Sequence, residues 1–212
     1  MFYVFGRALF RTIIRTLFRW RIEGKDNIPK EGPLILCCNH FSWWDPFHLG
    51  SAVDRPVRFM AKEEWFKIPV MGSIARGWGA FPVKRHTADR ASLRHALKVL
   101  EEGGVFGIFP EGTRSRTRQL MKPESGTAWI AIKARAPVVP AAIVGNYSWF
   151  KPLVMRIGKP IDLAAMYPGR TTSEDLEKAS QTIMNAIAAL LEQGMPGPER
   201  GNSAKPTDAA TD

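Results

Sequence analysis

The sequence predicts an α/β fold, a single domain in which a mainly parallel central sheet is flanked by helices. Two observations point to this class. Short apolar runs, typical of strands buried on both faces, alternate along the chain with segments of helical periodicity. The length of 212 residues suits one domain, because a chain of this size buries roughly 70% of its unfolded surface. We expect the domain to cover residues 22–194, after a helix at 1–21 and before a disordered tail at 195–212 that lacks apolar periodicity.

The elements of this domain follow from the same two patterns. The clearest helix covers residues 90–102, where Leu93, Ala96 and Leu97 share one face and Gly103 stands at the C-terminal end. Further helices are expected after Pro46, from Glu63, and over 127–134 and 173–192. The expected strands cover 34–38, 57–61, 80–83, 105–109, 137–144 and 153–157.

The stretch LILCCNHFSWWDP at residues 34–46 combines a buried strand with two polar side chains that could act together. Pro46 fits the first position of a helix and restricts the residue before it, so Asp45 lies where a helix begins and His40 lies in the preceding loop. A carboxylate that holds one imidazole nitrogen leaves the other nitrogen free to remove a proton from a hydroxyl group. The alternative is that Asp45 only caps the helix and His40 is an ordinary loop residue.

A second motif, FPEGTRS at residues 109–115, follows the expected strand at 105–109. Gly112 permits a close approach of the backbone, Glu111 can orient a neighbour or cap a helix, and the planar guanidinium of Arg114 suits a phosphate group. Taken alone, such a loop could equally be a solvated turn.

A third motif, GAFPVKR at residues 79–85, brings Lys84 and Arg85 to the end of a short strand. In isolation these would be two solvated charges. The apolar run VVPAAI at residues 138–143 is the fourth motif.

These motifs, in this order, resemble those of the glycerolipid acyltransferases, and in particular the 1-acylglycerol-3-phosphate (lysophosphatidic acid) acyltransferases. The resemblance covers roughly residues 25–160. It implies that His40 is the general base and that Asp45 orients it. It also implies that the phosphate of the acceptor is bound by side chains or backbone of Lys62, Arg85, Glu111, Gly112 and Arg114. The sequence departs from the family at Pro82, which removes an N–H donor and predicts an edge strand.

The resemblance further implies a reaction and its substrates. An acyl group would move from a thioester, acyl-CoA or acyl carrier protein, to the free hydroxyl of a lysophospholipid, giving phosphatidic acid without a metal, a cofactor or a covalent enzyme intermediate. One alternative is an acyltransferase acting on another lysolipid or glycolipid. A metal-dependent phosphohydrolase would need further His and Asp clusters. A non-enzymatic basic protein on membranes or nucleic acid would leave the motifs unexplained, and we expect no nucleic-acid partner.

The chain is basic, and the charge is concentrated near the N-terminus. The net charge is +10, and residues 1–30 hold seven basic and two acidic residues, which favours an anionic membrane surface as partner. Arg7, Arg11, Arg15 and Arg19 recur every four residues and form one stripe on a helix. Four arginines would cost about 2.5–3.5 kcal/mol each near the centre of a bilayer. We therefore expect an amphipathic helix that lies on the membrane with its arginines on the headgroups. The alternative is a helix packed on the domain itself.

The cysteine and histidine content adds two expectations. The two cysteines, Cys37 and Cys38, are adjacent in a predicted buried strand, which gives neither a disulfide nor a metal-site spacing and fits a reducing, intracellular setting. No signal peptide is evident, so the predicted location is the cytoplasmic face of the membrane, bound peripherally. His48, His86 and His95 are expected to be solvent or packing residues.

Overall fold

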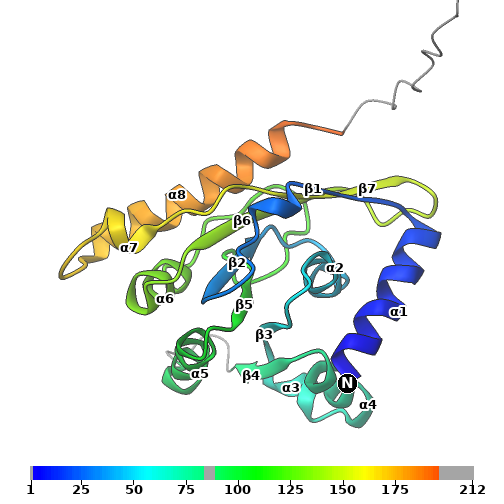
Figure 1. The fold of residues 1–212 in the computed structure, drawn as a ribbon, viewed down its shortest axis with the longest axis horizontal. Helices are drawn as coiled ribbons and strands as arrows, with labels where there is room; N and C mark the ends of the chain where they lie inside the picture. Colours follow the sequence, from blue (N-terminus) through cyan, green and yellow to red (C-terminus); the bar gives the residue numbers. More distant parts are fainter. Residues whose placement is uncertain (1, 84–88, 196–212) are drawn as a thin grey trace, which may run out of the picture.

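The computed structural model of the chain describes residues 2–83 and 89–195 (Figure 1). Within these residues, seven strands form one sheet in the order β1–β7–β6–β2–β5–β3–β4. The strands are β1 (Arg19–Glu23), β2 (Leu34–Cys38), β3 (Val57–Lys62), β4 (Ala80–Val83), β5 (Val105–Ile108), β6 (Val138–Gly145) and β7 (Pro152–Ile157). All neighbouring pairs are parallel except β6 and β7. The predicted α/β class with a mainly parallel sheet is confirmed.

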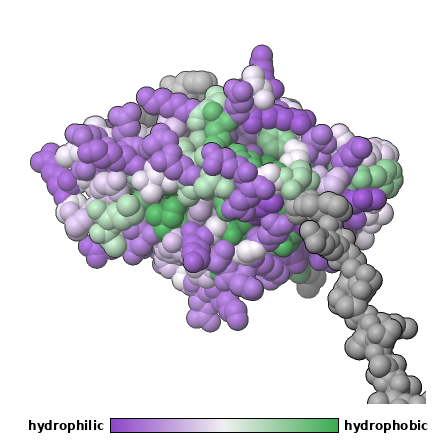
Figure 2. All heavy atoms as spheres, turned by 90° about the horizontal axis from the view of Figure 1, so that it is seen from above, coloured by the Kyte–Doolittle hydropathy of each residue, from purple (hydrophilic) through white to green (hydrophobic). Residues whose placement is uncertain are grey.

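Helices cover both faces of this sheet (Figure 1). They are α1 (Phe2–Leu17), α2 (Asp45–Ala52), α3 (Glu63–Phe66), α4 (Pro69–Gly77), α5 (Arg90–Glu101), α6 (Gly126–Ala134), α7 (Leu163–Met166) and α8 (Ser173–Glu192), with one 3-10 turn at Lys25–Asn27. On one face Leu34 and Leu36 of β2 belong to an apolar cluster shared with α1 and α2, and on the other Ile35 belongs to a cluster shared with α5, α6 and α8. Since successive strand residues point to opposite faces, β2 is buried on both sides, as its continuous apolar sequence predicts. The surface seen from above is mainly hydrophilic, with separate hydrophobic patches (Figure 2).

The direction of the strands places the predicted motifs at one edge of the sheet. β2, β5, β3 and β4 are neighbours and run parallel, so their carboxyl ends lie on the same side. Cys37 of β2 is in register with Ile108 of β5, and the two loops that follow these strands therefore meet. Crevices at the carboxyl ends of such strands are the usual ligand sites of open α/β sheets. β4 is the last strand of the sheet, which confirms the edge position predicted from Pro82.

The N-terminal segment differs from the prediction. The helix ends at Leu17, and Arg19–Glu23 forms strand β1, so the expected helix at 1–21 and its boundary with the domain at residue 22 are wrong. The backbone of β1 pairs in parallel with β7, and Trp20 is only 9% exposed. These contacts with a distant segment outweigh the helical periodicity of the arginines. The structure also adds α4 and α7, which were not predicted.

The arginine stripe of α1 faces the domain at its N-terminal half. Arg7 donates hydrogen bonds to the carbonyl oxygens of Val53 and Asp54, and Arg11 donates to those of Ser51 and Val53 and pairs with the Asp54 carboxylate. These carbonyls lie at the C-terminal end of α2, where unpaired carbonyl oxygens and the helix dipole attract cations. The Arg7 and Arg11 side of α1 is thus packed on the domain, whereas headgroup binding by the arginines of this helix stays a prediction. Among the described residues, no helix has both the length and the apolar character to cross a bilayer.

Candidate active site

His40 and Asp45 form a pair in the loop between β2 and α2. The Nδ1 atom of His40 lies 2.7 Å from Oδ2 of Asp45. The Asp45 side chain is fully buried, whereas the His40 side chain keeps 11% of its surface exposed. The imidazole stacks on Phe109 with ring centroids 4.1 Å apart, which fixes the plane of the ring. A neutral His40 that donates from Nδ1 to Asp45 presents Nε2 as a proton acceptor.

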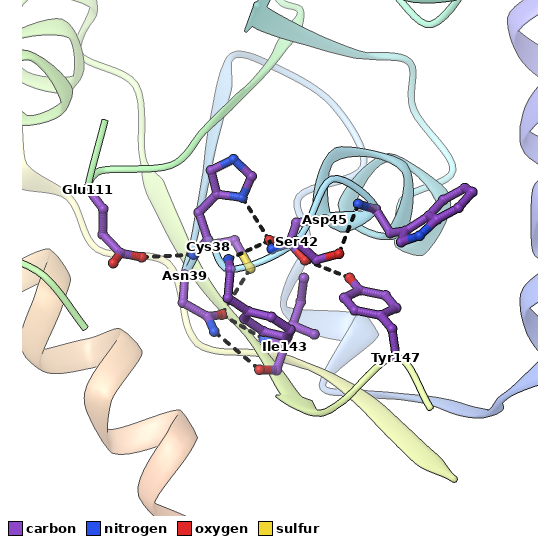
Figure 3. Close-up of polar contacts among 10 residues, drawn as sticks. Cys38, Asn39, Ser42, Asp45, Glu111, Ile143 and Tyr147 are labelled. Atoms are coloured by element: carbon purple, nitrogen blue, oxygen red, sulfur yellow. Dashed lines mark hydrogen bonds and ion pairs between the residues drawn. The ribbon is translucent and has the colours of Figure 1, made fainter. Parts of the chain in front are cut away.

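Asp45 is the centre of a hydrogen-bond network rather than a helix cap. Its Oδ2 atom accepts from the backbone N–H groups of Phe41 and Ser42, both at 2.7 Å, and its Oδ1 atom accepts from the Tyr147 hydroxyl at 2.6 Å. Figure 3 shows Asp45 between the loop of Ser42 and the side chain of Tyr147. The N-cap of α2 is Trp44, and no side chain caps this helix. The carboxylate therefore organises the loop before the helix.

Glu111 ties the second motif to the first. Its Oε1 atom accepts from the backbone N–H of His40 at 2.8 Å (Figure 3). Its Oε2 atom accepts from the N–H of Met121 at 3.0 Å. The N–H of Ser115 in turn donates to the His40 carbonyl oxygen at 2.7 Å. Glu111 is 3% exposed, and this burial raises the pKa of its carboxyl group despite the two N–H donors. Both oxygens thus hold the backbone of the site, and binding of the acceptor by Glu111 stays a prediction.

The glycine and arginine of the second motif lie in the same loop. Gly112 adopts a positive φ of 67° and its N–H closes a turn onto the Phe109 carbonyl oxygen. The guanidinium carbon of Arg114 lies 3.5 Å from the centroid of the Trp43 ring. Since Trp43 belongs to the loop of His40, this cation–π contact brings a positive charge to that loop.

The other two predicted phosphate ligands are Lys62 and Arg85. Lys62 ends β3 and pairs with Glu64 at 3.2 Å, with 44% of its side chain exposed. Arg85, like His86, lies outside the described residues. A role of either cation in acceptor binding stays a prediction.

Three further residues shape the site and were not predicted. Asn39 anchors the end of β2 to β6: its side chain accepts from the Ile143 N–H at 2.8 Å and donates to the Ile143 carbonyl oxygen at 3.2 Å. Phe109 supports the His40 ring, and Tyr147 binds Asp45. Asn39 and Phe109 belong to the motifs at residues 34–46 and 109–115, and this membership is the signal that could have identified them. No spacing in the sequence points to Tyr147.

His48, His95 and the two cysteines are packing residues. His48 is 1% exposed among aromatic rings, and this burial lowers its pKa to about 3, so it stays neutral at physiological pH. The ring of His95 packs on Phe81. Cys37 and Cys38 are fully buried free thiols, and burial raises the pKa of both. Within the described ranges, no group of three or more His, Cys, Asp or Glu side chains could hold a metal ion.

Comparison with known proteins identifies the family of this site. A family model described as Acyltransferase matches residues 19–144. The 1-acyl-sn-glycerol-3-phosphate acyltransferase of Bacillus subtilis (strain 168) is 35% identical over 181 residues, which cover 82% of this chain and 90% of that protein. The protein of the same name from Borreliella burgdorferi is 29% identical over 131 residues, 61% of this chain and 52% of that protein.

A solved structure agrees with the sequence relatives. The crystal structure of the 1-acyl-sn-glycerophosphate (LPA) acyltransferase PlsC from Thermotoga maritima superposes with a TM-score of 0.68 and 26% sequence identity, over 91% of this chain and 78% of that chain. The resemblance noted in the motifs is confirmed by these matches, which include the strands and loops of the His40 site. The chain belongs to the acyltransferase family.

Proposed function

We propose that this protein is a 1-acylglycerol-3-phosphate O-acyltransferase that forms phosphatidic acid from a lysophosphatidic acid and an acyl thioester. The observation that carries the proposal is the His40–Asp45 pair, 2.7 Å apart, at the carboxyl ends of β2 and β5 beside the cationic Arg114. The names of the Bacillus and Borreliella relatives and of the Thermotoga structure support this choice of acceptor.

The geometry supports direct transfer of the acyl group. Nε2 of neutral His40 removes the proton of the acceptor hydroxyl as its oxygen forms a bond to the thioester carbonyl carbon. The tetrahedral intermediate then collapses, the carbon–sulfur bond breaks, and the imidazolium returns the proton to the leaving thiolate. Asp45 stabilises the transient positive charge on His40. The products are an ester and a free thiol.

An acyl-enzyme on cysteine is disfavoured by the same structure. The nucleophile of such a route is a thiolate, and thiolates form at exposed sites near positive charges. Cys38 is fully buried, and burial together with the negative charge of Asp45 raises the pKa of its thiol. The proposed donor is the thioester of acyl-CoA or acyl carrier protein, used as a co-substrate with no further cofactor.

The experiment that tests the proposed acceptor compares two acceptors in the presence of a chelator. The purified protein should release thiol and form phosphatidic acid from lysophosphatidic acid, and should use a monoacylglycerol, which lacks the phosphate, much less well. In Arg114→Ala we expect the KM for lysophosphatidic acid to rise roughly 10- to 100-fold, since a charge-assisted contact is worth on the order of 1.5–3 kcal/mol. The KM for the thioester should change little.

The control variant is Arg94→Ala, which removes an exposed arginine from α5. It should keep the wild-type preference for the phosphorylated acceptor. If Arg114 only supports the Trp43 ring, its loss would raise both acceptor KM values together and leave their ratio unchanged. That outcome would remove Arg114 from the phosphate site.

We also propose that the protein meets the membrane through the apolar face of α1, defined by Phe5, Leu9 and Ile13. These three side chains are 68%, 51% and 42% exposed, and their helical positions lie on the side away from Arg7 and Arg11. Isolated apolar side chains are common on surfaces, but a contiguous helical stripe is typical of a docking surface. The membrane is the occupant we choose because the acceptor is a lipid.

The apolar exposure continues from α1 towards the active site. Phe10 of α1 stacks on Trp44, at 5.9 Å between ring centroids, and both Trp43 and Trp44 are 53% exposed in the loop of His40. Tryptophan is favoured at the headgroup level of a bilayer. At α4, Ile68, Val70 and Ile74 are also exposed. A bilayer touching these groups would lie against the loop that carries His40.

Phe5→Glu tests this surface. Burying a phenylalanine side chain contributes about 1.5–3 kcal/mol, so we expect binding to phosphatidylglycerol vesicles, measured by sedimentation, to weaken roughly 10- to 100-fold or more. Activity on a short-chain, water-soluble acceptor should remain. Met166→Glu is the matched control, because Met166 is 53% exposed on α7 at the opposite end of the molecule (Figure 1). Equal binding by both variants would show that the docking surface lies elsewhere.

A further inference from the structure

Tyr147 reaches the active-site pair from a segment outside the recognised motifs. It follows β6, 102 residues after Asp45 in the sequence, and its hydroxyl donates to Oδ1 of Asp45 at 2.6 Å. Among the described residues it alone donates to this oxygen, whereas Oδ2 faces His40 Nδ1 and the N–H groups of Phe41 and Ser42. Figure 3 shows Tyr147 and Glu111 on opposite sides of the site.

The surroundings of Tyr147 fix its ring and keep its hydroxyl a donor. The ring packs against those of His48, Phe41 and Phe18, with centroids 4.9, 5.6 and 6.0 Å away. Burial, and then the negative charge of Asp45, raise the pKa of Tyr147 well above its ordinary value. The phenol is therefore protonated at every physiological pH and cannot turn away without breaking these ring contacts.

We propose that Tyr147 is a positioning residue of the acyl-transfer reaction: it holds the Asp45 carboxylate, and through it the His40 ring, in the arrangement that removes the proton. The proposal rests on the proposed function. A fully buried carboxylate must have its lone pairs occupied by donors, because an unpaired buried charge is unstable. With Oδ1 fixed by Tyr147, Oδ2 is directed at His40 and is held ready to stabilise the imidazolium that forms as the acceptor attacks.

The proposal makes Tyr147 act on turnover rather than on substrate binding. Tyr147→Phe removes only the hydroxyl and keeps the ring contacts with the three aromatic neighbours. We expect kcat to fall about 10- to 100-fold. This rate factor corresponds to the loss of one hydrogen bond to a charged group. The KM values of acceptor and thioester should stay within about twofold, because the Tyr147 hydroxyl binds the Asp45 oxygen that does not face His40.

A matched control and a second background separate positioning from a general structural role. Tyr3→Phe also removes a half-buried phenol hydroxyl with one hydrogen bond, from the Val57 N–H at 3.0 Å, and should leave kcat unchanged. In a protein that already carries Asp45→Asn, Tyr147→Phe should cost little more, because the carboxylate on which it acts is gone. An equal loss of kcat in both backgrounds, or a wild-type kcat in Tyr147→Phe alone, would overturn the proposal.

A spectroscopic readout keeps this test independent of the substrates. The proton shared between His40 Nδ1 and Asp45 Oδ2 should give a downfield NMR resonance that is absent from His40→Ala. It should shift in Tyr147→Phe and stay in place in Tyr3→Phe. If the protein showed no acyltransferase activity but the resonance shifted as expected, the proposed function would fail while the coupling of Tyr147 to the pair would stand. An unchanged resonance in Tyr147→Phe would contradict the coupling itself.

Discussion

Replacing His40 with alanine is expected to lower kcat by about 10²- to 10⁴-fold, the usual contribution of a general base. The fold should survive, because the two hydrogen bonds that tie this residue to Glu111 and Ser115 involve its backbone and not its side chain. The measurement is the rate of thiol release with lysophosphatidic acid, together with the melting temperature of the variant.

His95→Ala is the control for this variant, since His95 is an exposed residue of α5 whose ring packs on Phe81. It should retain the wild-type rate. A folded His40→Ala protein with the wild-type rate would contradict the role of His40 as base.

Asp45→Asn is expected to lower kcat by a similar factor, about 10²- to 10⁴-fold, and also to lower the melting temperature. An amide oxygen can still accept from the N–H groups of Phe41 and Ser42, but the amide carries no charge to stabilise the His40 imidazolium. It also places an NH₂ group where one of the donors, His40 or Tyr147, now points.

The comparison that isolates this effect is Asp162→Asn, since Asp162 caps α7 by accepting from the Ala165 N–H. The Asp162 variant should lose some stability and keep its kcat. If Asp45→Asn behaved in the same way, active but less stable, Asp45 would be a structural residue and not part of the reacting pair.

Most of the sheet is predictable from the sequence because its strands are buried on both faces. The run LILCC can bury all its apolar side chains only between two layers of helices, and the structure places β2 there. β1 is the exception. Its sequence, RWRIE, continues the periodicity of the arginines before it, and the partner that makes it a strand is β7, more than 120 residues later. Local pattern carries no information about such a partner.

The arginine stripe shows a second limit of the same kind. A period of four residues predicts that Arg7 and Arg11 share one side of a helix, and they do. It does not say whether that side meets headgroups or protein, because carbonyl oxygens at a helix C-terminus attract a guanidinium as anionic lipids do. The end of α2 supplies those carbonyls through Ser51 and Val53.

The site residues that lie close together in the sequence were predictable. His40, Asp45, Glu111 and Arg114 lie in two short motifs, and the parallel pairing of β2 and β5 brings them together. Tyr147 was not predictable, because its hydroxyl reaches Asp45 only after β6 has placed the following loop over α2. That contact depends on how β6, the loop after it and α2 pack together.

The central claim is that the acyl group passes directly from the thioester to an acceptor activated by His40. The most direct measurement mixes the wild-type protein with an excess of acyl-CoA without acceptor, then determines released thiol and the intact mass of the protein. The account predicts no burst of thiol and no acyl adduct, followed by equal amounts of thiol and phosphatidic acid once lysophosphatidic acid is added. One equivalent of thiol and a protein heavier by one acyl group, which is then passed to lysophosphatidic acid, would contradict it.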